Sequence, residues 1–259
     1  MLPLHGVGVL VTRPQQQSMP LCRLLETQGA GTFRLPAIEI KPLGERRALA
    51  ARLGPIADFD LIIFVSSNAV RFGAMLLEQK RDLTLAAIGP ATARALNQAG
   101  YRVALQPAEG FDSESLLKAP RLNSLAGNRI LLIKGSNGRE LLQHELTRRG
   151  AQVTVAEVYR RERANPSAAE LAALEAHFAA GAIQVITATS VEIAGNLLEL
   201  ATPVLRREFD HVHWVVPGER IATSLRERGF TGALLQADSA EDQDLVAAII
   251  RWRASESGA

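Results

Sequence analysis

The sequence predicts an α/β protein of two similar lobes, each a parallel sheet flanked by helices, joined by a two-stranded linker. Three observations support this fold class. Short apolar runs alternate with helical patterns throughout the 259 residues. Most of these runs are continuously apolar, as strands buried on both faces of a parallel sheet are, and their order with the helices favours right-handed crossovers. The second half of the chain also repeats patterns of the first half.

Eight short apolar runs are the expected strands. They are rich in Val, Ile, Leu and Ala, and helical patterns separate most of them. Their lengths, four to six residues, fit buried strands better than helices. The predicted strands are residues 7–12, 60–65, 83–88, 102–105, 129–134, 184–187, 213–216 and 233–236.

Capping residues mark the helices between these strands. We expect Asn165 to be the N-cap of a helix that starts at Pro166 and ends before Gly181. Two further helices are expected to end before Gly100 and Gly150, because glycine is the usual residue just past a helix end.

The last helix is predicted from a capping-box pattern. Ser239 and Asp242 stand three residues apart, which is the spacing of that motif. Apolar residues follow with helical spacing and are expected to be buried. They are Leu245, Val246, Ile249 and Ile250.

The chain carries a weak internal duplication that covers nearly its whole length. Its segments follow the order A, B, A′, B′, and the copies align with shifts of 121 to 129 residues. The aligned pairs include Gly6 with Gly127, Gly29 with Gly150, Gly89 with Gly218, Gly100 with Gly229, and Ser66 with Ser190.

The duplication predicts a discontinuous domain organisation. The extended segments 32–43 and 152–164 occupy equivalent places in the two A copies, and we interpret them as paired linker strands. One domain then consists of residues 1–31 and 165–259, and the other of residues 44–151. Two crossings would form a hinge beside a cleft, which is a usual place for a ligand.

Composition excludes several classes of function. Lys and Arg number 29 and Asp and Glu 27, a net charge of +2 that is too balanced for a dedicated nucleic-acid binder. No apolar run approaches the roughly 20 residues of a membrane span, and the first residues show no signal-peptide pattern. The single cysteine, Cys22, lies among leucines, is expected in the core, and indicates a reducing cytoplasm.

Polar residues, glycines and cations follow six of the predicted strands. Ligands of open α/β sheets bind beyond the carboxyl ends of the strands, where backbone N–H groups of helix N-termini attract anions. A single junction of this kind is more often a plain helix cap. Six in one chain favour an anion site about as much as capping. The junctions begin at Thr12, Ser66, Gly89, Lys134, Thr187 and Pro217.

Other kinds of site are not indicated. Gly6 and Gly8 precede their strand, unlike the glycines of a dinucleotide fingerprint. His211 and His213 would share a strand face without further metal ligands nearby. The serine pair after residue 65 lacks a nucleophile elbow. The residues therefore predict a two-lobed protein with an anion-binding cleft, no metal and no organic cofactor, and they do not name a reaction.

Several stretches resemble the uroporphyrinogen-III synthase family in order and spacing over essentially the whole chain. They include "VLVTRP", "DLIIFVSSNAVRF", "AAIGPATARALNQAGYRVALQP", "RILLIKGSNGRELLQHELTRRGAQVTVAEVYRR" and "VVPGERIATSLRERGF". The resemblance implies a lyase that closes hydroxymethylbilane, a linear tetrapyrrole polycarboxylate. Water is lost and ring D is inverted to give uroporphyrinogen III, without a metal or organic cofactor.

The resemblance also implies the site residues. Tyr159 would donate a hydrogen bond or a proton to the departing hydroxyl, whereas the residue alone is interpreted equally well as a half-buried linker aromatic. The C-terminal lobe departs from the family pattern at "ITATS" and "VVPGERIA", so weaker contacts are expected there. Contacts with substrate carboxylates are implied for Thr12, Arg13, Ser66, Ser67, Asn68, Gly89, Pro90, Ala91, Thr92, Lys134, Gly135, Ser190, Gly218 and Ile221.

A second function class fits the same residues. A non-catalytic, two-lobed binding or regulatory module for an anionic metabolite would hold its ligand without converting it. For partners, we expect a monomer that binds a small molecule, receives it by transient handover from hydroxymethylbilane synthase, and binds neither nucleic acid nor membrane.

Overall fold

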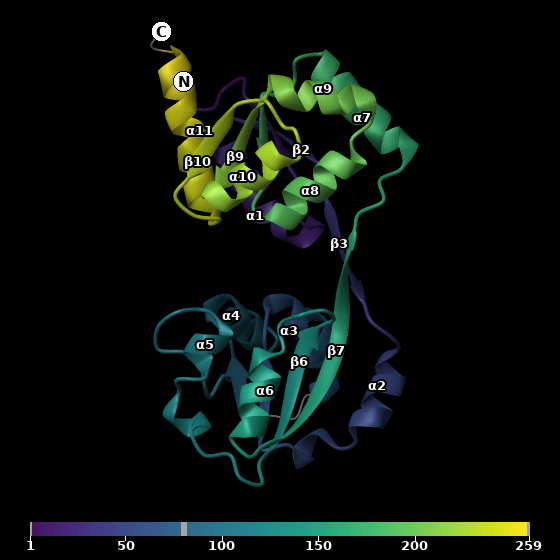
Figure 1. Ribbon diagram of the computed structural model, residues 1–259, viewed down its shortest axis with the longest axis vertical. Helices are drawn as coiled ribbons and strands as arrows, with labels where there is room; N and C mark the ends of the chain where they lie inside the picture. The colour runs from purple at the N-terminus through teal and green to yellow at the C-terminus, as the bar shows by residue number, and fades with distance from the viewer. Residues whose placement is uncertain (1, 79–81, 258–259) are drawn as a thin grey trace. The chain divides into compact units, whose positions relative to one another are not determined.

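The computed structural model describes residues 2–78 and 82–257, and its contacts divide the chain into two compact units. Unit 1 consists of Met1–Glu39 with Glu162–Ala259, and unit 2 is the continuous segment Ile40–Arg161. Each unit is built on one five-stranded sheet with helices on both faces (Figure 1). The predicted fold class, α/β with two similar lobes that each hold a sheet flanked by helices, is confirmed, and the sheets are mostly rather than wholly parallel.

The sheet of unit 1 has the strand order β10-β9-β8-β1-β2, and all its pairs are parallel. The inner strand β1 pairs with the edge strand β2 on one side and with the central strand β8 on the other. The strands are β1 (Gly8–Val11), β2 (Gly31–Arg34), β8 (Val185–Thr187), β9 (His213–Pro217) and β10 (Leu234–Ala237).

Helices cover both faces of this sheet. On one face, α1 and α11 pack leucine and isoleucine side chains against valines of the strands. On the other face, the rings of Phe178, Phe209, Trp214 and Phe230 form a chain with centroids 5.1–5.7 Å apart. The helices of unit 1 are α1 (Gln15–Thr27), α7 (Ala168–Ala179), α8 (Val191–Leu200), α9 (Pro203–His211), α10 (Glu219–Glu227) and α11 (Asp242–Ser257).

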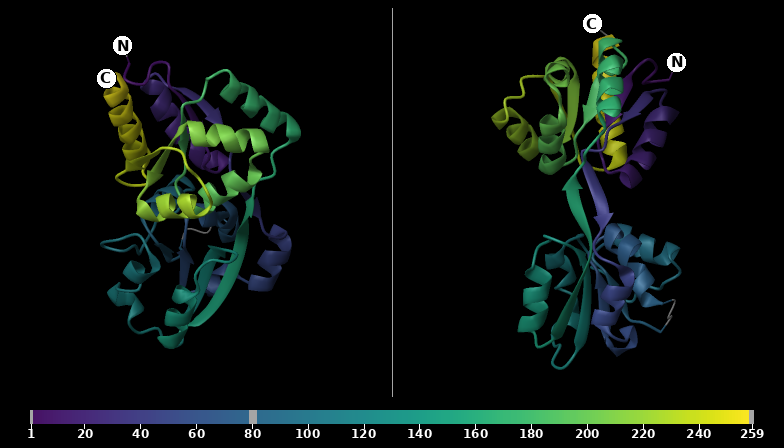
Figure 2. Two further views of the ribbon diagram at one scale, coloured as in Figure 1. Left: turned by 45° about the horizontal axis from the view of Figure 1, so that its top comes forward. Right: turned by 90° about the vertical axis from the view of Figure 1, so that its right-hand side faces the viewer.

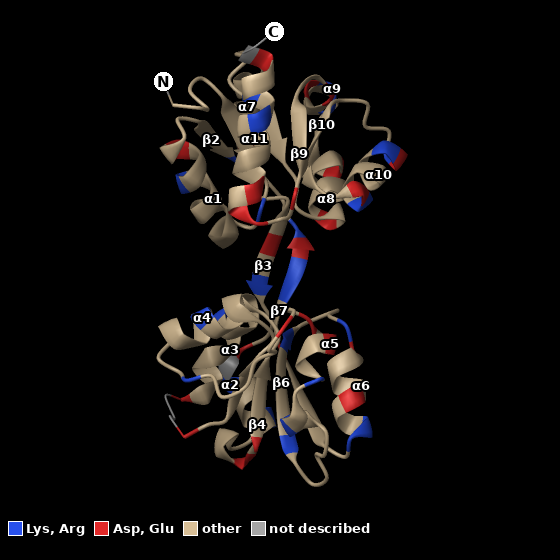
Figure 3. Cartoon of the chain, turned by 90° about the vertical axis from the view of Figure 1, so that its left-hand side faces the viewer, with Lys and Arg blue, Asp and Glu red and all other residues tan. Residues whose placement is uncertain are grey.

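The sheet of unit 2 has the order β3-β7-β6-β4-β5. The four strands from β7 to β5 are parallel, while the arrows of β3 and β7 run in opposite directions (Figure 3). Both β3 and β7 continue across the boundary between the units. The strands are β3 (Ile38–Pro42), β4 (Leu61–Phe64), β5 (Leu85–Ala87), β6 (Arg129–Gly135) and β7 (Gln152–Arg163).

Alternate residues of β4 and β6 face opposite sides of this sheet. Ile62 and Leu131 pack with α2, α3 and α4, whereas Ile63 and Leu132 pack with α5 and α6. The edge-on view in Figure 2 shows the teal helix on one side of the sheet and the blue helices on the other. The helices are α2 (Arg46–Leu53), η1 (Ile56–Asp58), α3 (Ser67–Gly73), η2 (Ala74–Leu77), α4 (Pro90–Gln98), α5 (Ser113–Leu116), η3 (Pro120–Leu122) and α6 (Leu141–Arg148).

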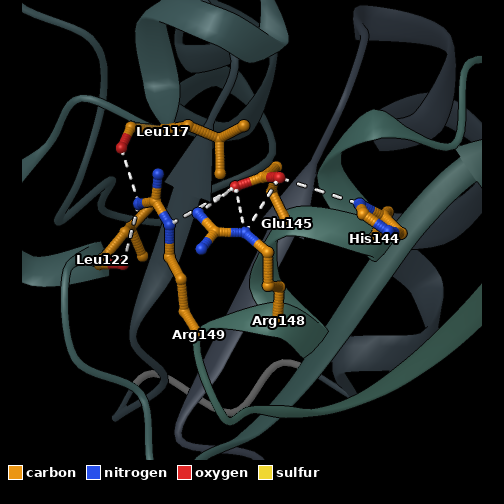
Figure 4. Close-up of polar contacts among 6 residues, drawn as sticks. All are labelled: Leu117, Leu122, His144, Glu145, Arg148 and Arg149. Atoms are coloured by element: carbon orange, nitrogen blue, oxygen red, sulfur yellow. Dashed lines mark hydrogen bonds and ion pairs between the residues drawn. The ribbon is translucent and has the colours of Figure 1, made fainter.

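A polar cluster ties the end of α6 to the loop before β6 (Figure 4). Arg149 donates through Nη1 to the carbonyl oxygens of Leu117, at 2.7 Å, and Leu122, at 2.9 Å. Arg148 pairs with Glu145 at 2.8 Å but is largely exposed. Because carbonyl oxygens in a part-buried loop need partners, Arg149 is the structural member of this cluster.

The duplication is visible in the backbone. The glycines of three aligned pairs share nearly the same positive φ. These values are 79° and 78° for Gly6 and Gly127, 90° and 94° for Gly29 and Gly150, and 85° and 80° for Gly100 and Gly229. The pair at the start of α4 and α10 differs, because Gly89 is extended with φ −174° while Gly218 has φ 90°. The two copies therefore share their turns and differ at one helix start.

Two predicted strand assignments were wrong. Residues 102–105 form only a single bridge from Leu105 to Ala86, and Pro107, which cannot donate to a ladder, follows two residues later. Residues 32–43 are not one extended strand. The chain is irregular over residues 35–37 and bends at Ala37, so β2 completes the sheet of unit 1, while β3 pairs with β7 in unit 2 as the predicted linker strands do.

Two predicted caps were also wrong. Ser167, not Asn165, is the N-cap of α7, and it forms a reciprocal capping box with Glu170. Near α11, the Ser239 hydroxyl bonds to Asp244 rather than Asp242. At α7 the acceptor for the first-turn N–H is the Ser167 hydroxyl, and near α11 the acceptor for the Ser239 hydroxyl is the carboxylate of Asp244. The expected burial of Leu245, Val246 and Ile249 is confirmed, and Ile250 is partly buried.

Candidate active site

Polar residues of unit 2 follow three neighbouring parallel strands. The junctions after β4 and β5 start α3 and α4, and the third junction opens the loop between β6 and α6. Because the carboxyl ends of parallel strands lie at the same edge of a sheet, the three junctions share one edge, here called the unit 2 edge. This edge carries Ser66, Ser67, Asn68, Gly89, Pro90, Ala91, Thr92, Lys134 and Gly135.

Ser66 connects the start of α3 to strand β7. Its backbone is extended, and its Oγ accepts a hydrogen bond of 2.9 Å from the backbone N–H of Ala69, so it is the N-cap. The same Oγ lies 3.1 Å from the hydroxyl oxygen of Tyr159, and either oxygen can be the donor. The hydroxyl of Ser66 is thus engaged twice within the protein.

The ring of Tyr159 is fixed on two sides. A register shift in the β6–β7 ladder sets Gly135 opposite Tyr159. A Cβ atom on Gly135 would lie 2.5 Å from ring atom Cζ, so only glycine fits there without movement. Phe72 stacks on the ring with centroids 5.9 Å apart. Tyr159 is 6% exposed, and its hydroxyl is directed to Ser66, so it is a buried residue of unit 2.

Backbone N–H groups of the unit 2 edge remain available at two helix starts. The first N–H groups of a helix have no carbonyl partner within it. At α3, Ser67 is exposed and Asn68 is 7% exposed. At α4, Gly89 is the N-cap and Pro90, which has no N–H, occupies the first position, so Ala91 and Thr92 supply the first free amides. Such groups suit a carboxylate or phosphate.

Lys134 stabilises the loop after β6. Its Nζ donates a hydrogen bond of 3.0 Å to the carbonyl oxygen of Gly138, and the residue is only 5% exposed. Asn137 adopts φ 58° within the same turn, and Arg139 pairs with Glu114 at 2.8 Å. The ammonium group therefore lies beneath a closed turn beside the unit 2 edge.

The predicted residues of unit 1 follow β1. Thr12 is fully buried and its hydroxyl donates to the carbonyl oxygen of Thr187 on β8. The guanidinium of Arg13 bonds to the carboxylate of Asp242 and to the carbonyl oxygen of Ala240, both at the start of α11. In the structure, Thr12 and Arg13 therefore bind other parts of unit 1.

Three further predicted residues lie at the starts of α8 and α10. Ser190 is the N-cap of α8 and accepts a hydrogen bond of 3.1 Å from the N–H of Ile193. Gly218 is the N-cap of α10, and the N–H of the buried Ile221 returns to its carbonyl oxygen at 3.3 Å. A groove of about 1070 Å³ between these helices includes Ser190. Its charged lining residues are Glu192, Glu199, Glu219, Glu227, Arg220 and Arg228.

Two aromatic residues at the unit 2 edge were not predicted. Phe72 stacks on Tyr159, a contact between residues 87 positions apart that no local pattern signals. Phe111 is 72% exposed, and its Cβ lies 3.1 Å from where a Cβ of Gly89 would be. The segment "EGFDSES", with one aromatic residue among turn formers, could have signalled an exposed ring.

Residues 2–78 and 82–257 contain neither a metal site nor a membrane span. In these residues, no group of three or more His, Cys, Asp and Glu side chains is placed to hold a metal ion. His213, considered above as a ligand, packs on the ring of Trp252 with centroids 4.7 Å apart. None of the helices within these ranges combines the length and apolar character that crossing a bilayer requires.

Comparison with known proteins gives consistent results at the level of sequence. The family model described as uroporphyrinogen-III synthase HemD matches residues 20–247. Uroporphyrinogen-III synthase of Escherichia coli K12 is 33% identical over 249 residues, which cover 94% of this chain and 100% of that protein. The synthase of Salmonella typhimurium LT2 is 34% identical over 254 residues, with the same coverage.

Solved structures show the same fold at lower identity. The uroporphyrinogen-III synthetase of Helicobacter pylori 26695 matches with a TM-score of 0.63 and 16% identity, covering 95% of this chain and 99% of that one. A mutant uroporphyrinogen III synthase of the extremely thermophilic bacterium Thermus thermophilus matches with a TM-score of 0.55 and 22% identity, covering 98% and 100%. At these identities, the structural likeness concerns the fold.

Proposed function

We propose a specific reaction and site for this chain, which belongs to the uroporphyrinogen-III synthase family and is an enzyme of tetrapyrrole biosynthesis. The reaction is the lyase step that closes hydroxymethylbilane with loss of water and inversion of ring D. The observation that carries the proposal is the match to curated synthases along 94% of the chain. No comparison favours a non-catalytic binding module.

The substrate's chemistry suits the unit 2 edge. Hydroxymethylbilane carries an acetate and a propionate on each pyrrole, and the bilane closes by itself to the uninverted isomer. The enzyme's task is therefore largely to hold one conformation of a polyanion, and such positioning can supply several kcal/mol of barrier reduction. The free amides at the start of α4 are donors for its carboxylates. Phe111, exposed beside Gly89, adds an apolar surface for a pyrrole ring.

Tyr159 is the proposed catalytic residue. Its hydroxyl lies at the unit 2 edge beside Ser66, and its ring is fixed by Gly135 and Phe72. In the proposed step, the hydroxyl donates a hydrogen bond or proton to the departing hydroxyl group of the bilane as the C–O bond breaks. The remaining residues inferred from the family stay proposals as carboxylate contacts. Those of unit 1 are Thr12, Arg13, Ser190, Gly218 and Ile221.

An assay coupled to a purified hydroxymethylbilane synthase tests the reaction. The product is oxidised to porphyrin and its isomers are separated by chromatography. We expect the type III isomer, formed equally well after dialysis against a chelator, because no metal or organic cofactor is proposed. Exclusive formation of the type I isomer would reject the function, and tight binding of the bilane without conversion would support the binding module instead.

The role of Tyr159 is tested by Tyr159→Phe. Removal of the hydroxyl should lower kcat on the order of 100-fold, as the loss of a general acid does. The unfolding free energy should change by only about 1 kcal/mol, because a single hydrogen bond to Ser66 is lost. A variant with unchanged kcat would remove Tyr159 from the mechanism.

Three further expectations, on location, oligomeric state and substrate transfer, complete the proposal. We place the enzyme in the cytoplasm, as a monomer that receives its substrate directly from hydroxymethylbilane synthase. Sedimentation analysis at micromolar concentration tests the monomer. Addition of an inactive hydroxymethylbilane synthase to the coupled assay tests handover, because it competes for docking and lowers the type III fraction only if transfer is direct.

A further inference from the structure

The hydroxyl of Ser66 occupies a branch point between a helix cap and the proposed catalytic tyrosine. Its oxygen accepts from the N–H of Ala69 at 2.9 Å, and it lies 3.1 Å from the oxygen of Tyr159. A serine hydroxyl has one hydrogen to donate and two lone pairs. Since the cap already takes one lone pair, the hydrogen and the second lone pair remain for Tyr159 and the substrate.

Counting donors separates two roles that Ser66 could have. A carboxylate only accepts hydrogen bonds, so a substrate carboxylate bound by Ser66 would need its single hydrogen. If that hydrogen is donated to Tyr159 instead, the hydrogen of Tyr159 is free to point at the substrate. Ser66 can perform only one of these roles at a time, although the family resemblance assigns it the first.

The surroundings of Tyr159 are compatible with the second role. Gly135 and Phe72 fix the ring, so the position of the hydroxyl oxygen is set and only its hydrogen can rotate. The ordinary freedom left to this group is the direction of its O–H bond. If the Ser66 hydroxyl donates across the 3.1 Å to Tyr159, it sets that direction, because a hydroxyl oxygen that accepts one hydrogen bond turns its own hydrogen elsewhere.

The duplication supplies an internal comparison. Ser190 aligns with Ser66 and caps α8 in the same way, accepting from the N–H of Ile193 at 3.1 Å. The sequence contains two tyrosines, Tyr101 and Tyr159, and both belong to unit 2. Capping is therefore common to both copies, while the hydrogen bond to a tyrosine is specific to Ser66.

We propose that Ser66 is a positioning residue, which donates its hydrogen bond to Tyr159 and so directs the tyrosine's hydrogen to the departing hydroxyl of the substrate. The proposal rests on the function proposed above, with Tyr159 as the proton donor. No covalent step involves Ser66.

The experiment compares Ser66→Ala, Ser66→Gly and Ser66→Thr with the wild type in the coupled assay. Loss of the donor should lower kcat by roughly 10- to 100-fold and leave KM within about twofold. Glycine is tolerated as an N-cap, so Ser66→Gly keeps the helix start if Ser66→Ala unfolds. Threonine retains the hydroxyl and should recover most of the activity.

A double mutant and a capping control complete the test. In a Tyr159→Phe background, Ser66→Ala should cause no further loss of kcat, because Ser66 acts through the tyrosine. Ser167→Ala removes the cap of α7 without a nearby tyrosine, and it should lower stability while leaving kcat unchanged.

Three outcomes would overturn the proposal. A raised KM with unchanged kcat would make Ser66 a carboxylate contact, additive losses in the double mutant would show independence from Tyr159, and unchanged kinetics in Ser66→Gly would leave it a cap alone. These results are distinct from failure of the proposed function, since that failure is a wild-type enzyme that forms no type III isomer.

Discussion

Replacement of Gly135 by alanine tests whether the position of Tyr159 controls the reaction. The added Cβ would lie 2.5 Å from Cζ of the tyrosine ring, and ordinary contacts begin near 3.4 Å. The ring must therefore move by about 3.4 − 2.5 = 0.9 Å, or the β6–β7 ladder must open at its register shift.

The two consequences have different sizes. A misplacement near 1 Å in a reacting group can lower a rate by about 100-fold. Overpacking of this kind typically lowers the unfolding free energy by about 1–3 kcal/mol. We therefore expect Gly135→Ala to fold and to lose kcat by on the order of 100-fold.

The assay is the coupled formation of type III isomer, with urea unfolding measured in parallel. Gly31→Ala is the matched control, because Gly31 lies in strand β2 with no atom within 4 Å of its Cβ position and no positive φ. If both Gly135→Ala and the control Gly31→Ala retain the wild-type kcat, the fixed position of Tyr159 does not control the reaction and the reasoning fails.

The remaining predictions concern stability and reactivity. Arg149→Met should lower the unfolding free energy of unit 2, measured in urea, by about 2–4 kcal/mol, because two carbonyl oxygens lose a charged donor. Arg148→Met, at an exposed side chain, should change it little. Equal effects of the two substitutions would contradict this prediction. The hydrogen bond from Arg148 lowers the pKa of Glu145. The stabilisation by this carboxylate is therefore present above its ordinary pKa of 4.5 and disappears as pH falls through the lower folded-state pKa. Over that range, the difference in unfolding free energy between the wild type and Glu145→Gln, measured in urea, should shrink and not grow. Burial raises the pKa of the Cys22 thiol, so a thiol reagent at pH 7 should label it only after urea is added. Rapid labelling of the folded protein would refute the placement of Cys22 in the core.

The sequence predicted the inner strands well because each is a short, continuous apolar run. β4 and β6 lie within one residue of their expected bounds at each end, since burial on both faces leaves little choice of residue. One predicted strand beside β5 did not form. Residues 102–105 are apolar enough for a strand, but the ladder needs a partner over several residues, and only Leu105 forms a bridge.

In the candidate site too, local features were predictable from the sequence and long-range contacts were not. The junctions after the strands could be located from local patterns, because a cap and a strand end are encoded within a few residues. The contacts at Tyr159 could not be located, because Ser66 and Tyr159 are 93 residues apart and the register shift opposite Gly135 has no sequence signal of its own. The engagement of Arg13 by Asp242 joins residues 229 apart and was equally invisible.

The discontinuity of unit 1 has a consequence for the order of events on the ribosome. Unit 2 is one continuous segment and can close its sheet once about residue 161 has emerged. The inner strand β1 of unit 1 instead bonds to a partner 176 residues later, as Gly8 does with Gln184. Because such distant pairing forms slowly and translation is vectorial, β1 and β2 must wait with their edges uncovered while unit 2 folds. The nascent chain is thus most exposed to misassociation or chaperone capture at β1 and β2.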